Sequence, residues 1–234
     1  MRLEKRATKN LGFTAQYTYA KSLGVNSTLN GSISEFPRPQ NSRDIRADYG
    51  LSAFDHNHRF VTNFVYRLPF GPGMRFLGST HGFVGKVLEG WQTTGILTFQ
   101  DGVPFTVRTG SDRSNTGEGA DRPDQIGNPE LEKSQRTIQR YFNTNAFMLQ
   151  AQNTFGSAGR NTVRGPGYSN IDFSLIKSTK IIENHRLEFR AEFFNLFNHP
   201  NFNIPDRTYI SATFGQINAA FPSRDIQFGL KYIF

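Results

Sequence analysis

Two short stretches of the chain carry side chains that could bind a metal ion or attack a substrate. Asp55-His56-Asn57-His58 forms an H-x-H pair, and two imidazoles can share a metal ion, although the spacing fixes no third ligand. Residues 78–82 read Gly-Ser-Thr-His-Gly, which lacks the G-x-S-x-G spacing of a hydrolase nucleophile. We therefore expect no catalytic residue, no metal site and no cofactor, and the protein is not expected to be an enzyme.

A third stretch is acidic and could suggest a calcium site. Two arginines lie among its carboxylates, and the spacing of an EF-hand loop is absent. We interpret the stretch as a solvated loop. The residues concerned are Asp112, Arg113, Glu118, Asp121, Arg122 and Asp124.

The composition excludes cysteine-based sites and argues against a nucleic-acid partner. The 234 residues include 23 Phe, one Trp and no Cys, so disulfides, thiolate metal sites and cysteine nucleophiles are excluded together. The formal charge of +8 is spread along the chain, and its tightest group is Arg2, Lys5, Arg6 and Lys9, with Glu4 among them. No nucleic-acid-binding motif follows this group, so we expect no nucleic-acid partner. A basic soluble RNA-binding β-protein remains an alternative that expression without detergent would distinguish.

The elements that must position these residues are strands with one apolar and one polar face. The clearest alternation runs from 186 to 195, where Leu187, Phe189, Ala191 and Phe193 oppose charged residues. The last residues of the chain repeat it. The six segments that read this way are 11–19, 60–68, 91–99, 171–175, 186–195 and 226–234, the third of which could continue past Asp101-Gly102 through Phe105 and Val107.

The links between these strands indicate the architecture. Long links, at 23–57, 109–169 and 199–223, alternate with shorter ones, as in outer-membrane barrels that have long outer loops and short periplasmic turns. Counting back from a periplasmic C-terminus places every long link outside the cell. The chain contains no unbroken apolar run of about 18 residues, so no transmembrane helix is predicted. The sequence therefore predicts an all-β fold, an antiparallel transmembrane β-barrel, of which residues 1–234 form a part.

Six strands are too few to close a barrel, which needs about eight. We expect both outer strands to have unpaired edges that the rest of the barrel would cover. The alternative is a soluble antiparallel sandwich with large loops.

The alternation also predicts which face of each strand points toward lipid and which points toward the lumen. Charges on a lipid-facing strand are costly, so Glu188, Arg190 and Glu192 are predicted to face the lumen. The aromatic and aliphatic residues opposite them are predicted to face lipid; these are Phe189, Phe193, Phe228 and Leu230. Residues 195–202, Asn-Leu-Phe-Asn-His-Pro-Asn-Phe, are interpreted as a structural turn at the outer rim.

Several segments resemble the C-terminal end of TonB-dependent outer-membrane receptors, in particular the Oar-like group with a carboxypeptidase-regulatory-like domain. The matching segments are AQYTYAKSL (15–23), FDHNHRFVTNFVYRLPFG (54–71), GWQTTGILTFQDGVPFTV (90–107), NTGEGADRPD (115–124), YFNTNAF (141–147), FGSAGRNTVRGPG (155–167), LEFRAEFFNLFNHPNF (187–202) and RDIQFGLKYIF (224–234).

The resemblance implies a barrel of roughly 22 strands that is filled by a plug, with residues 1–234 as the C-terminal part of that barrel. It implies uptake of a bulky nutrient, such as a metal chelate, glycan or peptide, with energy delivered by TonB. The plug, the TonB box, the regulatory-like domain and a signal sequence would lie upstream of Met1. The expected partners are outer-membrane lipid, the remainder of the barrel and plug, TonB through that upstream part, and the barrel-assembly machinery. The competing class is a non-transporting surface or adhesion barrel.

The C-terminus carries aromatic or aliphatic residues at every second position. Phe228, Leu230, Tyr232 and Phe234 resemble the signal by which the barrel-assembly machinery recognises its substrates. Such recognition would add a strand at an exposed edge, with alternate side chains held in pockets. The alternative is an ordinary girdle of aromatic residues at the membrane interface.

Overall fold

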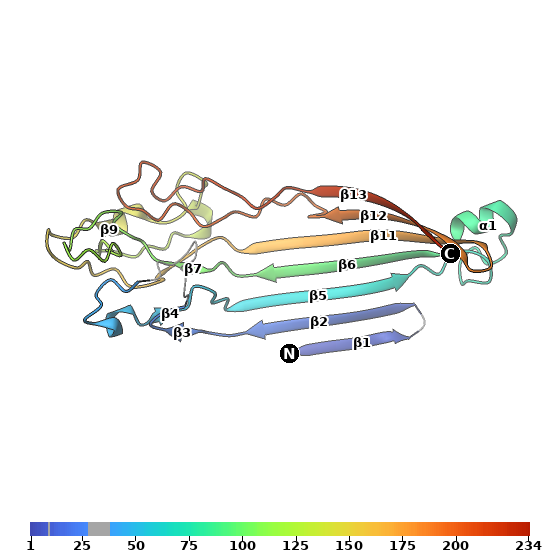
Figure 1. The fold of residues 1–234 in the computed structure, drawn as a ribbon, viewed down its shortest axis with the longest axis horizontal. Coiled ribbons are helices and arrows are strands. Elements are labelled where there is room, and N and C mark those ends of the chain that lie inside the picture. The colour runs from blue at the N-terminus through green and yellow to red at the C-terminus, as the bar shows by residue number, and fades with distance from the viewer. Residues whose placement is uncertain (9, 28–37) are drawn as a thin grey trace.

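The computed structural model describes residues 1–8, 10–27 and 38–234. In this part of the chain the main element is an open antiparallel sheet of seven strands, ordered β1-β2-β5-β6-β11-β12-β13, with β1 and β13 at its two edges (Figure 1). The strands are β1 (Arg2–Thr8), β2 (Leu11–Tyr19), β5 (His58–Arg67), β6 (Trp91–Gln100), β11 (Tyr168–Ile182), β12 (His185–Phe194) and β13 (Asp225–Ile233).

The sheet contains the six expected strands and one more. The additional strand is β1, which pairs with β2 from Arg2 opposite Gln16 to Thr8 opposite Leu11. It was missed because Leu3 is its one large apolar side chain, and charged residues surround it. The basic group at the start of the chain thus lies mainly on an edge strand, where charges discourage unwanted pairing. The strand predicted at 171–175 is also longer, since β11 continues to Ile182.

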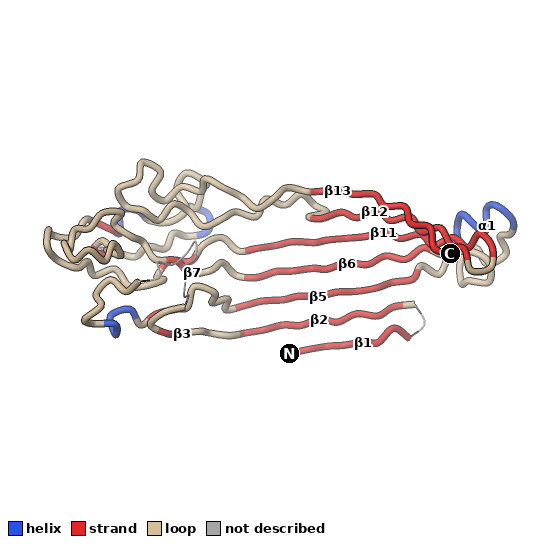
Figure 2. Tube along the Cα trace, viewed as in Figure 1, coloured by secondary structure: helices blue, strands red, loops and turns tan. Residues whose placement is uncertain are grey.

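All long links lie at one end of the sheet, as the alternation of link lengths predicts (Figure 2). Residues 20–57, 101–167 and 195–224 connect strands at this end. The opposite end carries the tight β11–β12 turn, the end of β13, and the link 68–90 with helix α1 (Gly82–Leu88). Among the described residues, no helix is both long and apolar enough to cross a membrane.

One face of the sheet is mainly apolar, and large apolar side chains lie opposite each other on it across several strand pairs. Tyr17 lies opposite Phe60, Phe60 opposite Phe99, and Phe189 opposite Leu230. Phe228 and Leu230 are each 70% exposed, and the other sheets in the described residues have only two strands. Because no second large sheet covers the apolar face here, the architecture differs from the alternative soluble sandwich.

The long links fold together beyond this end of the sheet into a separate region, which we call the loop cap (residues 20–27, 38–57, 101–167 and 195–224). It contains the main hydrophobic cluster of the molecule, formed by Phe105, Val107, Phe142, Ala146, Phe147, Ala158 and Val163. Its short elements are β3 (Leu23–Gly24), η1 (Ile45–Asp48), β4 (Gly50–Leu51), β7 (Pro104–Phe105), β8 (Asp124–Gln125), η2 (Lys133–Gln135), η3 (Thr144–Ala146), β9 (Phe147–Met148) and β10 (Val163–Arg164).

Candidate functional site

The loop cap begins where the chain leaves β6 at Asp101-Gly102. A Cβ atom on Gly102 would lie 1.9 Å from the carbonyl oxygen of Gly165, so only glycine fits this crossing. The chain then buries Phe105 completely in the cap. The suggested continuation of the strand through Phe105 and Val107 is therefore wrong, because both residues pack into the cap and not onto the sheet.

Aromatic rings fill the interior of the cap. Phe142 is central, with ring centroids 5.7 Å from Phe105, 6.1 Å from Phe147 and 5.3 Å from Phe214, all edge to face. This geometry suits the ring quadrupoles and adds to the burial of apolar area. The cap thus has a core of its own, although it consists mainly of loops.

A buried ion pair joins two of the long links. Arg122 lies 2.7 Å from Asp48, and the two side chains are 6% and 5% exposed. The Gln40 side-chain oxygen accepts hydrogen bonds from the backbone N–H and the Nε–H of Arg122. Burial lowers the pKa of Arg122, and the neighbouring Asp48 carboxylate opposes that shift. Because a buried charge without a partner is costly, this pair holds residues 38–57 against 101–167.

Two further arginines attach the same link. Arg160 donates to the carbonyl oxygens of Asp48, at 2.6 Å, and of Gly50, at 3.1 Å. Arg164 pairs with the buried Asp55 carboxylate at 2.5 Å and also donates to Asn57 Oδ1 at 2.8 Å. The cap is therefore organised by arginines that bind residues about a hundred positions away in the sequence. A guanidinium suits this role because its several N–H donors can bind more than one acceptor at once.

The acidic stretch is partly exposed, as at Asp112, and partly buried. Asp121 is 2% exposed and accepts hydrogen bonds from the backbone and hydroxyl of Ser114. Asp112 accepts from the backbone N–H of Gly117 at 2.9 Å, and this bond lowers the pKa of the Asp112 carboxyl. The prediction of a solvated loop is wrong for Asp121 and for Arg122, because both are buried by the cap.

The two histidines of the H-x-H pair contact different groups. His56 Nδ1 lies 2.6 Å from the carbonyl oxygen of Asp101, and His58 Nδ1 lies 2.7 Å from the Tyr17 hydroxyl. Each ring is therefore already held by a neighbouring strand or loop. In the described ranges, no group of three or more His, Cys, Asp or Glu side chains could hold a metal ion.

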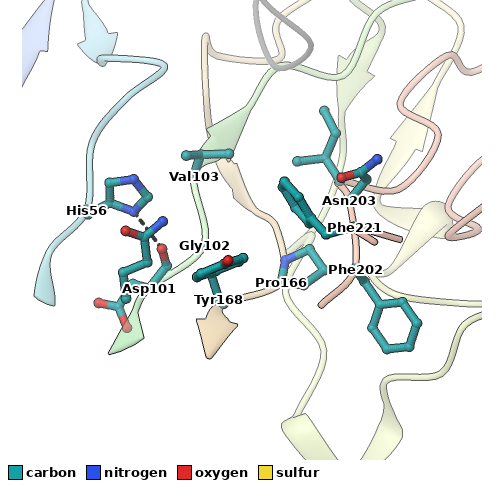
Figure 3. A pocket seen from close by; sticks show the side chains of 12 residues that line it. His56, Asp101, Gly102, Val103, Pro166, Tyr168, Phe202, Asn203 and Phe221 are labelled. Atoms are coloured by element: carbon teal, nitrogen blue, oxygen red, sulfur yellow. Dashed lines mark hydrogen bonds between the residues drawn. The ribbon is translucent and has the colours of Figure 1, made fainter. Parts of the chain in front are cut away.

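His56 borders a small cavity between the sheet and the cap (Figure 3). The cavity has a volume of about 80 Å³ and is lined by His56, Asp101, Tyr168, Phe202, Asn203 and Phe221, among others. The Tyr168 and Phe221 rings meet edge to face, with centroids 5.5 Å apart. This space suits a few water molecules rather than a nutrient.

A larger polar recess lies on the cap. Its volume is about 480 Å³, and its lining residues are Asn41, Ser42, Arg43, Asn115, Thr116, Glu118 and Phe155. Within the described residues, no ion pair involves Arg43 or Glu118, and Phe155 is 38% exposed. The recess thus combines a free cation, a free carboxylate, amides and an aromatic face, groups that can orient a polar ligand.

The charged residues predicted to face the lumen all lie on the polar face of the sheet. Arg190 donates to Glu188 at 2.7 Å, and Glu188 lies opposite Lys231 on β13. Gln227 donates to the Glu192 carboxylate. The charges are therefore partnered along and across the strands, and their orientation toward a lumen stays a prediction.

The residues of the predicted assembly signal lie at the end of the exposed edge strand. Phe228, Leu230 and Tyr232 share the apolar face, and the Tyr232 hydroxyl lies 2.6 Å from His185 Nδ1. Phe234 is 86% exposed, with its ring centroid 6.0 Å from that of Tyr232. This geometry fits both an assembly signal and an aromatic girdle, so the role of these residues stays a prediction.

Residues 195–202 form a turn at the loop-cap end, as predicted. Asn195 exchanges hydrogen bonds with the backbone of His199, and its own φ is +52°. Asn201 exchanges a second pair with the backbone of Ser169. Asparagine tolerates the left-handed conformation, so this composition fits the turn.

Sequence reasoning missed the arginines and carboxylates that organise the cap. Spacing cannot pair Asp48 with Arg122, because nothing local indicates which distant loops meet. A signal was nevertheless present, because Phe142, Phe147, Arg160 and Arg164 fall in two of the segments that carry the family resemblance.

Comparison with known proteins identifies the family of this chain. Searches of the curated proteins and of the solved structures found no significant match to this chain. The family model described as "Outer membrane beta barrel domain" matches residues 1–227. Because this match covers nearly the whole chain, the protein belongs to the outer membrane beta barrel domain family, and this membership implies the outer membrane of Gram-negative bacteria.

Proposed function

We propose that the chain is the C-terminal barrel segment of a TonB-dependent receptor, of the Oar-like group, that takes part in the uptake of a bulky nutrient. Membership in an outer-membrane barrel family supports the location, and the segments quoted above support the finer assignment. In this arrangement the apolar face contacts lipid, and the polar face contacts the lumen or the plug.

The observation that carries the proposal is the folded loop cap at one end of the sheet. A receptor that captures a ligand before transport needs binding groups held in place, because ordering loose loops costs free energy. Arginines paired with buried carboxylates, together with an aromatic core, hold this cap together. The polar recess on it would supply the first contacts with a polar nutrient.

The competing function, a surface or adhesion barrel, needs neither a plug nor TonB. Experiments on the full-length protein can distinguish the two functions. If it is a receptor, the reading frame upstream of Met1 encodes a plug and a TonB box, and the purified protein retains the periplasmic domain of TonB in a pull-down assay.

A full-length protein with no plug, and with no retention of TonB, would contradict the receptor assignment and favour the adhesion barrel. Deletion of the TonB box is the matched control, since it removes the interaction and leaves the barrel unchanged.

A further inference from the structure

The link between β5 and β6 exposes a group of large apolar side chains at the end of the sheet opposite the loop cap. Phe83 on α1 is 83% exposed, and its neighbours Val84 and Val87 are 57% and 44% exposed. The preceding loop adds Met74, Phe76 and Leu77, each about half exposed. A water-facing loop rarely gathers apolar side chains in this way, so the group points to a partner surface.

The link is firmly attached to the sheet and is not a loose tail. Lys177 of β11 donates to the carbonyl oxygens of Lys86, at 2.8 Å, and Glu89, at 2.6 Å. Trp91 of β6 donates from its indole N–H to the carbonyl oxygen of Val87 at 2.8 Å. The end of α1 is therefore fixed by two strands.

The same two side chains show on which face of the sheet α1 ends. Trp91 and Lys177 lie opposite each other in the β6–β11 register, and the Lys177 ammonium lies 5.2 Å from the centre of the Trp91 ring. The register places Lys177 opposite Phe189 on β12, on the apolar face. The end of α1 thus lies beside the apolar face rather than the polar one.

The charge of the link favours one kind of partner. Residues 68–90 contain Arg75 and Lys86 but a single carboxylate, Glu89, whose carbonyl oxygen is bound by Lys177. The Arg75 guanidinium lies 5.5 Å from the centre of the Phe76 ring. Apolar side chains next to cations suit the boundary between acyl chains and anionic headgroups of a phospholipid leaflet.

We infer that residues 68–90 form a membrane-interface anchor, in which Phe83, Val84 and Val87 of α1 enter the phospholipid leaflet at this end of the barrel. The lipid-covered apolar face continues directly into the anchor through Trp91. The inference goes beyond nutrient uptake, since an adhesion barrel with the same link would be anchored in the same way.

The absence of cysteine in the chain allows a direct test. Phe83→Cys is labelled with an environment-sensitive fluorophore, and the protein is reconstituted into vesicles of phosphatidylethanolamine and phosphatidylglycerol that contain nitroxide-labelled lipid. Leu230→Cys on the apolar face is the control for lipid contact, and Lys133→Cys on the loop cap is the control for water. We expect blue-shifted emission at position 83 and a loss of intensity of about twofold or more, as for a side chain at the acyl boundary.

Two results would overturn the anchor. Quenching at position 83 no stronger than at position 133 would leave α1 in water, and blue-shifted emission without quenching would indicate that protein covers it. Val84→Cys repeats the measurement at a second position. Absence of quenching at position 230 as well would place the whole apolar face outside lipid, and would refute the anchor together with the barrel orientation.

Discussion

Arg122 joins two distant links of the loop cap, because its guanidinium is buried against the Asp48 carboxylate. Arg122→Met would leave Asp48 buried without its partner. We expect the free energy of unfolding to fall by about 3–5 kcal/mol, as for other buried pairs broken on one side. Denaturant unfolding of the detergent-solubilised protein measures the change.

The matched control is Arg2→Met, which removes an exposed pair with Glu4. Such surface pairs contribute about 1 kcal/mol or less. Equal losses for the two variants would contradict the assigned role of Arg122.

Deletion of the single residue Phe234 tests whether the C-terminal pattern is an assembly signal. If the C-terminal pattern is read by the barrel-assembly machinery, deletion of Phe234 from the full-length protein leaves unassembled protein in the periplasm. If Phe234 is only a girdle residue, insertion stays normal and stability falls slightly. Unchanged outer-membrane levels, measured by fractionation and immunoblotting, would rule out the assembly role.

At the scale of elements, Gly102 determines where the sheet ends and the cap begins. Gly102→Val places a side chain in the space occupied by the Gly165 carbonyl group, so we expect the cap to detach locally. The variant should lose about 2 kcal/mol or more of stability, because the crowded atom is backbone and cannot rotate away. Limited proteolysis should then cut within 103–125, a segment with several buried residues.

Gly127→Ala is the control for this change, since its Cβ would meet Ala146 at an ordinary 3.7 Å. Equal protease sensitivity of the two variants would show that the crossing at Gly102 is not the junction that we describe.

The elements also show what sequence reasoning can and cannot reach. The alternation at 186–195 predicts β12 well, because charged and apolar residues alternate between its two faces from Arg186 to Phe193. The charged strand β1 lacks this contrast, so it was missed. The prediction for β11 was too short, because residues 177–180 read Lys-Ser-Thr-Lys and are polar on both faces. The pairing of residues within the cap could not be predicted, because its arginines find partners through tertiary contacts that no periodicity encodes.

For the whole molecule, the topology that we propose would place the loop cap outside the cell. Trypsin added to intact cells should therefore cut at Lys133 or Arg140, which are exposed on the cap. Lys180, near the β11–β12 turn, should be protected until the outer membrane is permeabilised. Cleavage near Lys180 in intact cells, with Lys133 protected, would reverse the topology.

The central claim is that the sheet lies in the bilayer with its apolar face toward lipid. Single cysteines along β13, at Gln227, Phe228, Gly229, Leu230 and Lys231, test it directly through quenching of an attached fluorophore by nitroxide-labelled lipid. We predict a period of two, with strong quenching at Phe228 and Leu230 and weak quenching at the other three positions. Uniform quenching along the strand, or strong quenching at Gln227, Gly229 and Lys231 instead, would contradict the account.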